Sequence, residues 1–405
     1  MLNMPAIRLL IALTVGLSAG SLFAGTNYEG PLLSVARPIG KLWLDALTMT
    51  VVPLVTALLI AGVFEAGQSG GNAIARRAMA WFAGLLVVVS LLGGLVALGL
   101  LQLSPIPDQA ARLTAAVAAP VPMTTGAWTD NIIPANIVKA AADTAMVPLV
   151  VFALLFGFAL TRIDRDHGEN IARMFRGIAE TMLVIVGWVL WIAPIGVLAL
   201  AFGVGVALGA GAAGILLHYV IVIILVCLTI ATMMHILAAT LGLAGVIKFA
   251  RAVIPAQAVA MSTQSSLASL PVMLSAAPAL RVDTASAGII LPLAVSLFRA
   301  ASAAANVAVA VYLAQLHGVP ITTGTFIAGA LVAAAVSVGA VGLPAQVSFF
   351  AVIAPVCVAM GVPVTLLPLL LAIETLPDVF RTLGNVTADL TVMRLAGHKP
   401  GNHPT

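Results

Sequence analysis

The segment from residue 372 to 390 places four ionisable side chains within an otherwise apolar part of the chain. At 100° per residue, these side chains share one helical face, about 100° wide, with two uncharged polar neighbours. The six polar residues are Glu374, Asp378, Arg381, Thr382, Asn385 and Asp389. A charge at the centre of a membrane costs about 2.5 to 3.5 kcal/mol on insertion scales, so such a face turns toward a protein interior or a water-filled path.

Asp378 and Arg381 lie about one helical turn apart and offer complementary chemistry. A carboxylate accepts hydrogen bonds from an ammonium group, and the planar guanidinium of arginine binds a carboxylate with two parallel bonds. Together they fit an amino acid that carries a second acid group. The alternative interpretation is a structural ion-pair seam between helices.

The composition predicts an all-α integral membrane protein. Of the 405 residues 62% are hydrophobic and 8% are charged, whereas a soluble domain carries about 25% charged residues. Cys227 and Cys357 lie in apolar runs without metal-ligand spacing, so they are expected core residues and no metal site is predicted. The net charge of +4 is spread over loops, which indicates cytoplasmic basic loops rather than nucleic-acid binding.

Hydropathy, with Gly, Pro and charge as breaks, predicts eight transmembrane helices. The first is expected to be retained rather than cleaved as a signal peptide. Their expected ranges are 6–25, 42–66, 78–103, 132–161, 177–205, 213–242, 284–316 and 363–392.

Two further apolar stretches, 253–280 and 324–360, are interrupted by STQSSLASLP and SVGAVGLPAQ. Irregular backbone at membrane depth persists only where it is enclosed by protein or lines a cavity, so both are predicted to be re-entrant helical hairpins. A pair of ordinary kinked helices is the alternative.

The distribution of basic residues predicts the orientation in the bilayer. In this helix count twelve Lys and Arg side chains lie on one side and four on the other. The excess places both termini in the cytoplasm. The expected location is the plasma membrane, or the inner membrane of a Gram-negative cell.

At this point the sequence resembles the dicarboxylate/amino acid:cation symporter family, which includes the glutamate transporter homologues. The likeness covers nearly the whole chain and is carried by short motifs. They are TVVPLV at 50–55, NIIPANIVKA at 131–140, APIGV at 193–197, STQSSLASLP at 262–271, LPLAV at 291–295, GLP at 342–344 and DVFRTLGNVTAD at 378–389.

The resemblance implies roles for named residues. In the last motif Asp378 would bind the substrate amino group and Arg381 its side-chain carboxylate, with Thr382 and Asn385 as further ligands. The first hairpin would contribute Ser265 and Ser266, and Gly342 with Pro344 would form the tip of the second hairpin, the extracellular gate. Family members selective for succinate-like dicarboxylates lack the amino-group aspartate, so Asp378 favours acidic amino acids.

The resemblance also implies the domain organisation of a homotrimer with an elevator mechanism. Scaffold helices one and two would occupy 1–75, transport-domain helix three 76–104, and scaffold helices four and five 105–210. The rest of the transport domain would occupy 211–396, followed by a cytoplasmic tail at 397–405.

The pattern departs from the family where its seventh helix carries Asn-Met-Asp-Gly-Thr, a sodium-binding motif. Here the aligned residues are Phe298, Arg299, Ala300, Ala301 and Ser302. Ser302 keeps a hydroxyl and remains a substrate-binding candidate, whereas the sodium ligands are gone. Losing the motif's glycine should also make the segment more helical, because alanine favours helix by about 1 kcal/mol.

Charge counting suggests a change in ion coupling. Two arginines, Arg299 and Arg381, face three carboxylates, Glu374, Asp378 and Asp389, which gives 2 − 3 = −1. We therefore expect Arg299 to act as a tethered cation for Asp389; the alternative is that it snorkels and fills space. Because burial disfavours an ionised carboxylate, Glu374 is the candidate carrier of a coupling proton.

The sequence thus predicts a secondary transporter of acidic amino acids or dicarboxylates with reduced or no sodium dependence. Its partners would be a small anionic substrate and the lipid bilayer, with no cofactor; a proton is favoured over sodium as the coupling ion. The runner-up is a transport-inactive relative that acts as a binding sensor or structural membrane protein. A pore or an intramembrane enzyme is disfavoured, because the polar residues gather in one pocket and no nucleophile and base pair is apparent.

Overall fold

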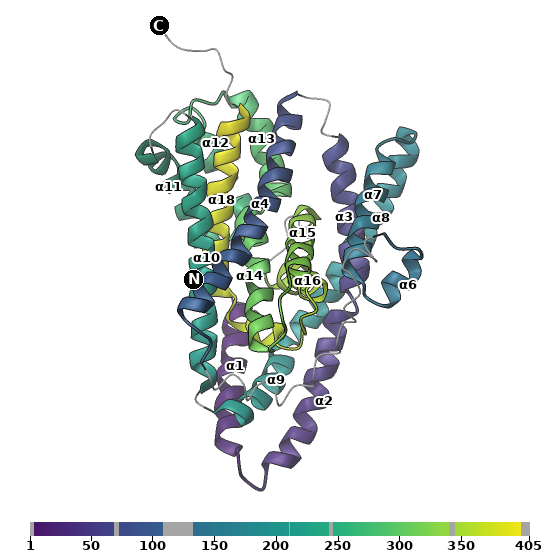
Figure 1. Cartoon of the computed structure of the whole chain (residues 1–405), viewed down its shortest axis with the longest axis vertical. Helices are drawn as coiled ribbons and strands as arrows, with labels where there is room; N and C mark the ends of the chain where they lie inside the picture. Colours follow the sequence, from purple (N-terminus) through teal and green to yellow (C-terminus); the bar gives the residue numbers. More distant parts are fainter. Residues whose placement is uncertain are drawn as a thin grey trace.

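The computed structural model describes residues 4–68, 73–107, 133–209, 211–242, 246–339 and 345–397. Within these ranges every regular element is an α-helix (Figure 1). In chain order they are α1 (Met4–Phe23), α2 (Glu29–Thr48), α3 (Val51–Gln68), α4 (Ala73–Leu103), α6 (Ile137–Ala142), α7 (Met146–Leu160), α8 (Arg165–Trp191), α9 (Ala193–Leu208), α10 (Gly211–Gly242), α11 (Val246–Thr263), α12 (Ser266–Ala276), α13 (Thr284–Leu297), α14 (Ala300–Leu316), α15 (Thr323–Gly339), α16 (Ala345–Ala359), α17 (Leu367–Ile373) and α18 (Thr375–Gly397).

Five described helical segments are long and apolar enough to cross a membrane. They are Glu29–Gln68, Ala73–Leu103, Arg165–Trp191, Gly211–Ala239 and Thr284–Leu316. Large apolar side chains such as Phe158, Trp188 and Trp191 are exposed on the outside of the bundle. Such a surface suits lipid rather than water, so the all-α membrane class is confirmed.

Several helices that we predicted to be continuous are interrupted in the structure. The predicted 177–205 helix stops at Ile192, because Pro194 at the start of α9 cannot continue the hydrogen-bond ladder. The 132–161 helix is divided where Asn136 caps α6 and Thr144 adopts a positive φ of 54° before α7. The predicted 42–66 helix is also two elements, because α2 ends at Thr48 and α3 begins at Val51. Its predicted start was wrong, since α2 begins at Glu29.

The last predicted helix, 363–392, is likewise two elements. α17 ends at Ile373 and α18 begins at Thr375, with Glu374 between them. Pro377 has no N–H to donate to the carbonyl four residues earlier, which accounts for the interruption. Glu374 thus lies at a helix junction rather than in the middle of a helix.

The two interrupted apolar stretches each form a pair of helices that pack against each other, α11 with α12 and α15 with α16. Gln264, between α11 and α12, has a positive φ of 53° and turns the chain there. The tip of the second pair, residues 340–344, falls outside the described residues.

Helix α18, which carries the predicted charged face, packs among several other helices. It packs against α10, α11, α13 and α14, and it is shown in yellow beside α10, α11 and α12 in Figure 1. Helix α4 covers α14 from the other side, where a Cβ on Gly93 would lie 2.5 Å from the carbonyl oxygen of Ala304. That close approach requires glycine. A second group of helices, including α1 with α9 and α3 with α7 and α8, packs together apart from α18.

Candidate substrate-binding site

The polar face of α18 is buried as the helical spacing predicted. Asp378, Arg381, Thr382, Asn385 and Asp389 are each at most 5% exposed. Because ions are seldom buried without partners, the neighbours of each side chain indicate what it can do.

Arg381 binds protein groups through two of its three nitrogens. Its Nε lies 2.6 Å from Glu374 Oε1 in a buried ion pair. Its Nη1 donates to Asn306 Oδ1 at 2.8 Å, from α14. Its Nη2 is buried and has no hydrogen-bond partner among the described residues. Arg381 therefore keeps one unused, desolvated donor.

Glu374 is held by side chains from two helices, α18 and α10. Its Oε1 pairs with Arg381, and its Oε2 accepts a hydrogen bond of 3.0 Å from the hydroxyl of Tyr219 on α10. Neither Tyr219 nor Asn306 was predicted from the sequence as a site residue. Asn306 had a usable signal, because it follows Ser302 by one helical turn in an apolar helix. Tyr219 had none, since only the packing of α10 on α18 places it there.

Asp378 also keeps an unused group. Its Oδ2 is buried and has no hydrogen-bond partner among the described residues. The Thr382 hydroxyl donates to the Asp378 main-chain carbonyl at 2.9 Å, within the helix. An unused acceptor on Asp378 and an unused donor on Arg381 are thus presented from neighbouring turns of one helix.

Ser302 and Asn385 join α14 to α18 through two hydrogen bonds. The Asn385 Nδ2 donates to Ser302 Oγ at 2.9 Å, and the Ser302 N–H donates to Asn385 Oδ1 at 3.1 Å. Both side chains are buried. The structure therefore brings these two predicted residues together, as a clamp at the start of α14.

In the segment aligned with the family's sodium motif, the helix is interrupted and an aromatic pair packs beside the interruption. The predicted 284–316 helix breaks at Phe298 and Arg299, whose φ values are −116° and −111°, while Ala300 and Ala301 lie in α14 as the loss of glycine suggested. The Phe298 ring stacks on Phe82 of α4, with centroids 4.9 Å apart and planes at 14°. An aromatic pair therefore occupies the space beside the break.

Arg299 is buried beside the carboxylates of α18. Its charge is coupled electrostatically to Asp378, Arg381 and Asp389. Asp389 is therefore one of several charges near Arg299, and its role as the main counterion of Arg299 stays a prediction. Neither oxygen of Asp389 has a hydrogen-bond partner among the described residues.

The predicted site residues of the first hairpin lie at the start of α12. Ser265 is half-buried and its Oγ accepts from the Ala268 N–H at 3.2 Å, which caps α12. Ser266 begins α12 and is also half-buried. Gly342 and Pro344, the predicted gate, lie outside the described residues.

Among the described residues no cluster of three or more His, Cys, Asp or Glu is arranged to hold a metal ion.

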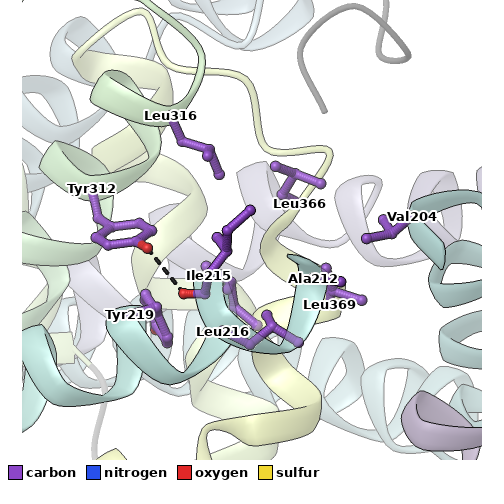
Figure 2. Close-up of a pocket in the computed structure, with 10 residues that line it drawn as sticks. Val204, Ala212, Ile215, Leu216, Tyr219, Tyr312, Leu316, Leu366 and Leu369 are labelled. Atoms are coloured by element: carbon purple, nitrogen blue, oxygen red, sulfur yellow. Dashed lines mark hydrogen bonds between the residues drawn. The ribbon is translucent and has the colours of Figure 1, made fainter. Parts of the chain in front are cut away.

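A small pocket lies beside Tyr219. Its walls are apolar and come from α9, α10, α14 and α17, including Val204, Leu216, Leu316 and Leu369 (Figure 2).

Within a helical membrane bundle, a buried cluster of charged side chains of this kind is typical of a solute carrier. A sequence model of the sodium:dicarboxylate symporter family matches residues 6–398, and the chain belongs to this family. This confirms the resemblance drawn from the motifs. The protein is accordingly a multi-pass membrane transporter and not an enzyme.

Characterised relatives are distant but align over most of their length. The chain is 25% identical to the proton/glutamate-aspartate symporter of Escherichia coli, over 96% of this chain and 91% of that protein. It is 26% identical to the proton/sodium-glutamate symport protein of Bacillus caldotenax, over 94% and 90%. It is 25% identical to C4-dicarboxylate transport protein 2 of Pseudomonas paraeruginosa, over 95% and 87%.

Proposed function

We propose that this protein is a symporter of acidic amino acids or dicarboxylates in the plasma membrane. The observation that carries the proposal is the pair of unused buried groups, Asp378 Oδ2 and Arg381 Nη2, on adjacent turns of α18. A buried donor or acceptor without a partner costs about 1 to 3 kcal/mol, so a ligand that satisfies both is stabilised. An acidic amino acid offers an ammonium for the first and a carboxylate for the second. Relatives named for glutamate, aspartate and C4-dicarboxylates support the same substrate class.

The proposed coupling ion is a proton, with little or no use of sodium. In support, Phe298 stacks on Phe82 and Arg299 carries a permanent charge where the family places sodium ligands. A tethered cation cannot dissociate in each cycle, so it compensates charge without transmitting the energy of an ion gradient.

Glu374 is the proposed proton carrier. Its ionised carboxylate occupies Arg381, the residue that we assign to the substrate carboxylate. A proton that adds to Glu374 from the aqueous side would weaken this pair and make the guanidinium available. Substrate and proton would then bind together, as symport requires.

The proposed architecture is the family's arrangement of eight transmembrane helices and two re-entrant hairpins, with both termini in the cytoplasm. The paired packing of α11 with α12 and of α15 with α16 supports the hairpins. Helix α1 packs on α9, and α3 packs on α7 and α8, and none of these five is among the helices that pack closely on α18; this supports a scaffold distinct from the helices around α18. A homotrimer in which the transport domain slides as an elevator is proposed from the family alone.

Proteoliposome uptake tests this function. Labelled aspartate, glutamate and succinate are offered in sodium, potassium and choline media, with and without an inward proton gradient. We expect accumulation that follows the proton gradient and is the same in all three media. Binding without accumulation would instead assign the chain to the sensor class. Accumulation that requires sodium would overturn the coupling proposal.

A further inference from the structure

Tyr219 is a fully buried tyrosine on α10 whose hydroxyl contacts the buried charged residues of the site. It is 0% exposed, and its hydroxyl donates to Glu374 Oε2 at 3.0 Å. Its ring packs edge-on against Tyr312, with centroids 5.3 Å apart and planes at 77°. Both rings also line the apolar pocket in Figure 2. The Tyr312 hydroxyl in addition lies 3.2 Å from Nδ1 of His218, which is also on α10.

The contacts of Glu374 are divided between two kinds of donor. Oε1 faces the charged guanidinium of Arg381, whereas Oε2 faces the neutral hydroxyl of Tyr219. A hydrogen bond to an ionised carboxylate in a buried site is stronger than one to its protonated form. The Tyr219 hydroxyl therefore favours the ionised state of Glu374, which is the state that occupies Arg381.

The other titratable groups around this pair belong to several elements. Arg381 and Asp378 act on Glu374 from α18, and the charge of Glu374 reaches Cys227 on α10. Tyr312 on α14 interacts electrostatically with Tyr219. Arg299, at the break before α14, interacts electrostatically with Arg381 and Asp378. None of these groups donates to Glu374 Oε2 among the described contacts, so Tyr219 has a distinct position.

We propose that Tyr219 is a positioning residue that sets the pH at which Glu374 releases Arg381 to the substrate carboxylate. This inference rests on the proposed function, in which Glu374 carries the coupling proton. When the proton adds to Glu374, the Tyr219 hydroxyl loses its charged acceptor and the guanidinium keeps its charge. With a stronger hydrogen-bond donor at position 219, Glu374 takes up its proton only at lower pH. Without the donor, Glu374 takes up its proton already at higher pH.

The test is the pH dependence of aspartate affinity, measured by calorimetry on the purified full-length protein. The wild type should bind tightly at low pH and weakly at high pH. Tyr219→Phe keeps the ring and removes the hydroxyl, so tight binding should extend upward by about one pH unit, the equivalent of one charge-assisted hydrogen bond. Tyr312→Phe is the matched control, because its hydroxyl donates to the Ile215 carbonyl at 3.0 Å instead. It should keep the wild-type midpoint.

Two further variants separate positioning from folding. A fluorinated tyrosine at position 219 preserves the packing and donates more strongly, so its midpoint should move below that of the wild type. In a Glu374→Gln background, Tyr219→Phe should produce no shift, because the titrating group is gone.

An unchanged midpoint in both Tyr219→Phe and the fluorinated protein would overturn the inference and leave the proposed transport function intact. A wild-type affinity that is flat with pH would overturn it as well. Failure of the wild type to bind any acidic amino acid or dicarboxylate would instead break the proposed function itself.

Discussion

The stretch of α18 from Asp378 to Asn385 and the break at Phe298 and Arg299 belong to one buried network but differ in what they keep of the family pattern. In α18 the acid, base, hydroxyl and amide all remain and are buried. At the break, Phe298 and Ala300 align with the asparagine and aspartate of the family's sodium motif, and Arg299 between them adds a positive charge. On the proposed function, the substrate-binding side chains of the family pattern are therefore kept while its sodium ligands are lost, and the proton site on Glu374 pairs directly with the substrate residue Arg381.

The largest effect should come from Arg381, on the side that keeps the family pattern. Arg381→Ala removes a desolvated charge that we assign to the substrate carboxylate. Losing one partner of a buried charge pair typically costs 2 to 5 kcal/mol, or about 30-fold or more in affinity. Calorimetry with aspartate, glutamate and succinate measures this loss.

Arg394→Ala is the matched control for that experiment. Arg394 is also buried on α18, but its Nη1 donates to the Leu280 carbonyl outside the pocket, at 2.6 Å. It should lower thermal stability and leave the affinity of the folded protein unchanged. Unchanged substrate affinity in Arg381→Ala would refute the assignment of this residue.

Asp378 should discriminate between substrate classes. Asp378→Asn keeps the size of the side chain and removes its charge, so it weakens the contact with a substrate ammonium. We expect aspartate affinity to fall by roughly 10- to 100-fold, the range of a charge-assisted hydrogen bond, whereas succinate affinity stays the same. A wild type that prefers succinate over aspartate would contradict this role, and would indicate that the nearby Arg299 already neutralises Asp378.

A variant of Arg299 tests the segment that departs from the family's sodium motif. Its removal leaves Asp378 and Asp389 without the cation that acts on both. We expect wild-type affinity to be independent of sodium at constant ionic strength, and Arg299→Met to bind about tenfold more weakly, since buried charges need compensation. Sodium should restore that affinity only in part, because the family's other ligands are also missing.

Arg251→Met is the control, since Arg251 is an exposed arginine on α11. It should match the wild type at every sodium concentration. A wild-type affinity that rises steeply with sodium would show that the cation sites persist, and Arg299 would lose its proposed role.

The same comparison shows what could be predicted from sequence. The buried face of α18 was predictable because charges in an apolar segment have to turn inward, and one helical period fixes which residues share a face. The partners of these charges could not be predicted. Arg381 pairs with Glu374, and Tyr219 and Asn306 contact this pair only because α10 and α14 pack on α18. Several helix junctions were missed for a related reason. Ile192 lies two residues before a proline and Glu374 three residues before one, inside apolar runs where hydropathy alone shows no interruption.

The smallest effect should come from Ser302, the residue at which the two regions meet. Its hydroxyl accepts from Asn385 on the retained side, although it belongs to the segment that has lost its sodium ligands. Ser302→Ala leaves the bond from the Ser302 N–H to Asn385 Oδ1 and deprives Asn385 Nδ2 of one acceptor, at a cost of about 1 kcal/mol. We expect aspartate affinity to fall by about fivefold, because Asn385 is a proposed substrate ligand and needs a fixed orientation. Ser286→Ala is the control, since that buried hydroxyl donates to Asp283 at 2.7 Å away from the pocket. It should lower stability without changing affinity, so equal losses of affinity in the two variants would show that Ser302 acts through the fold rather than through Asn385.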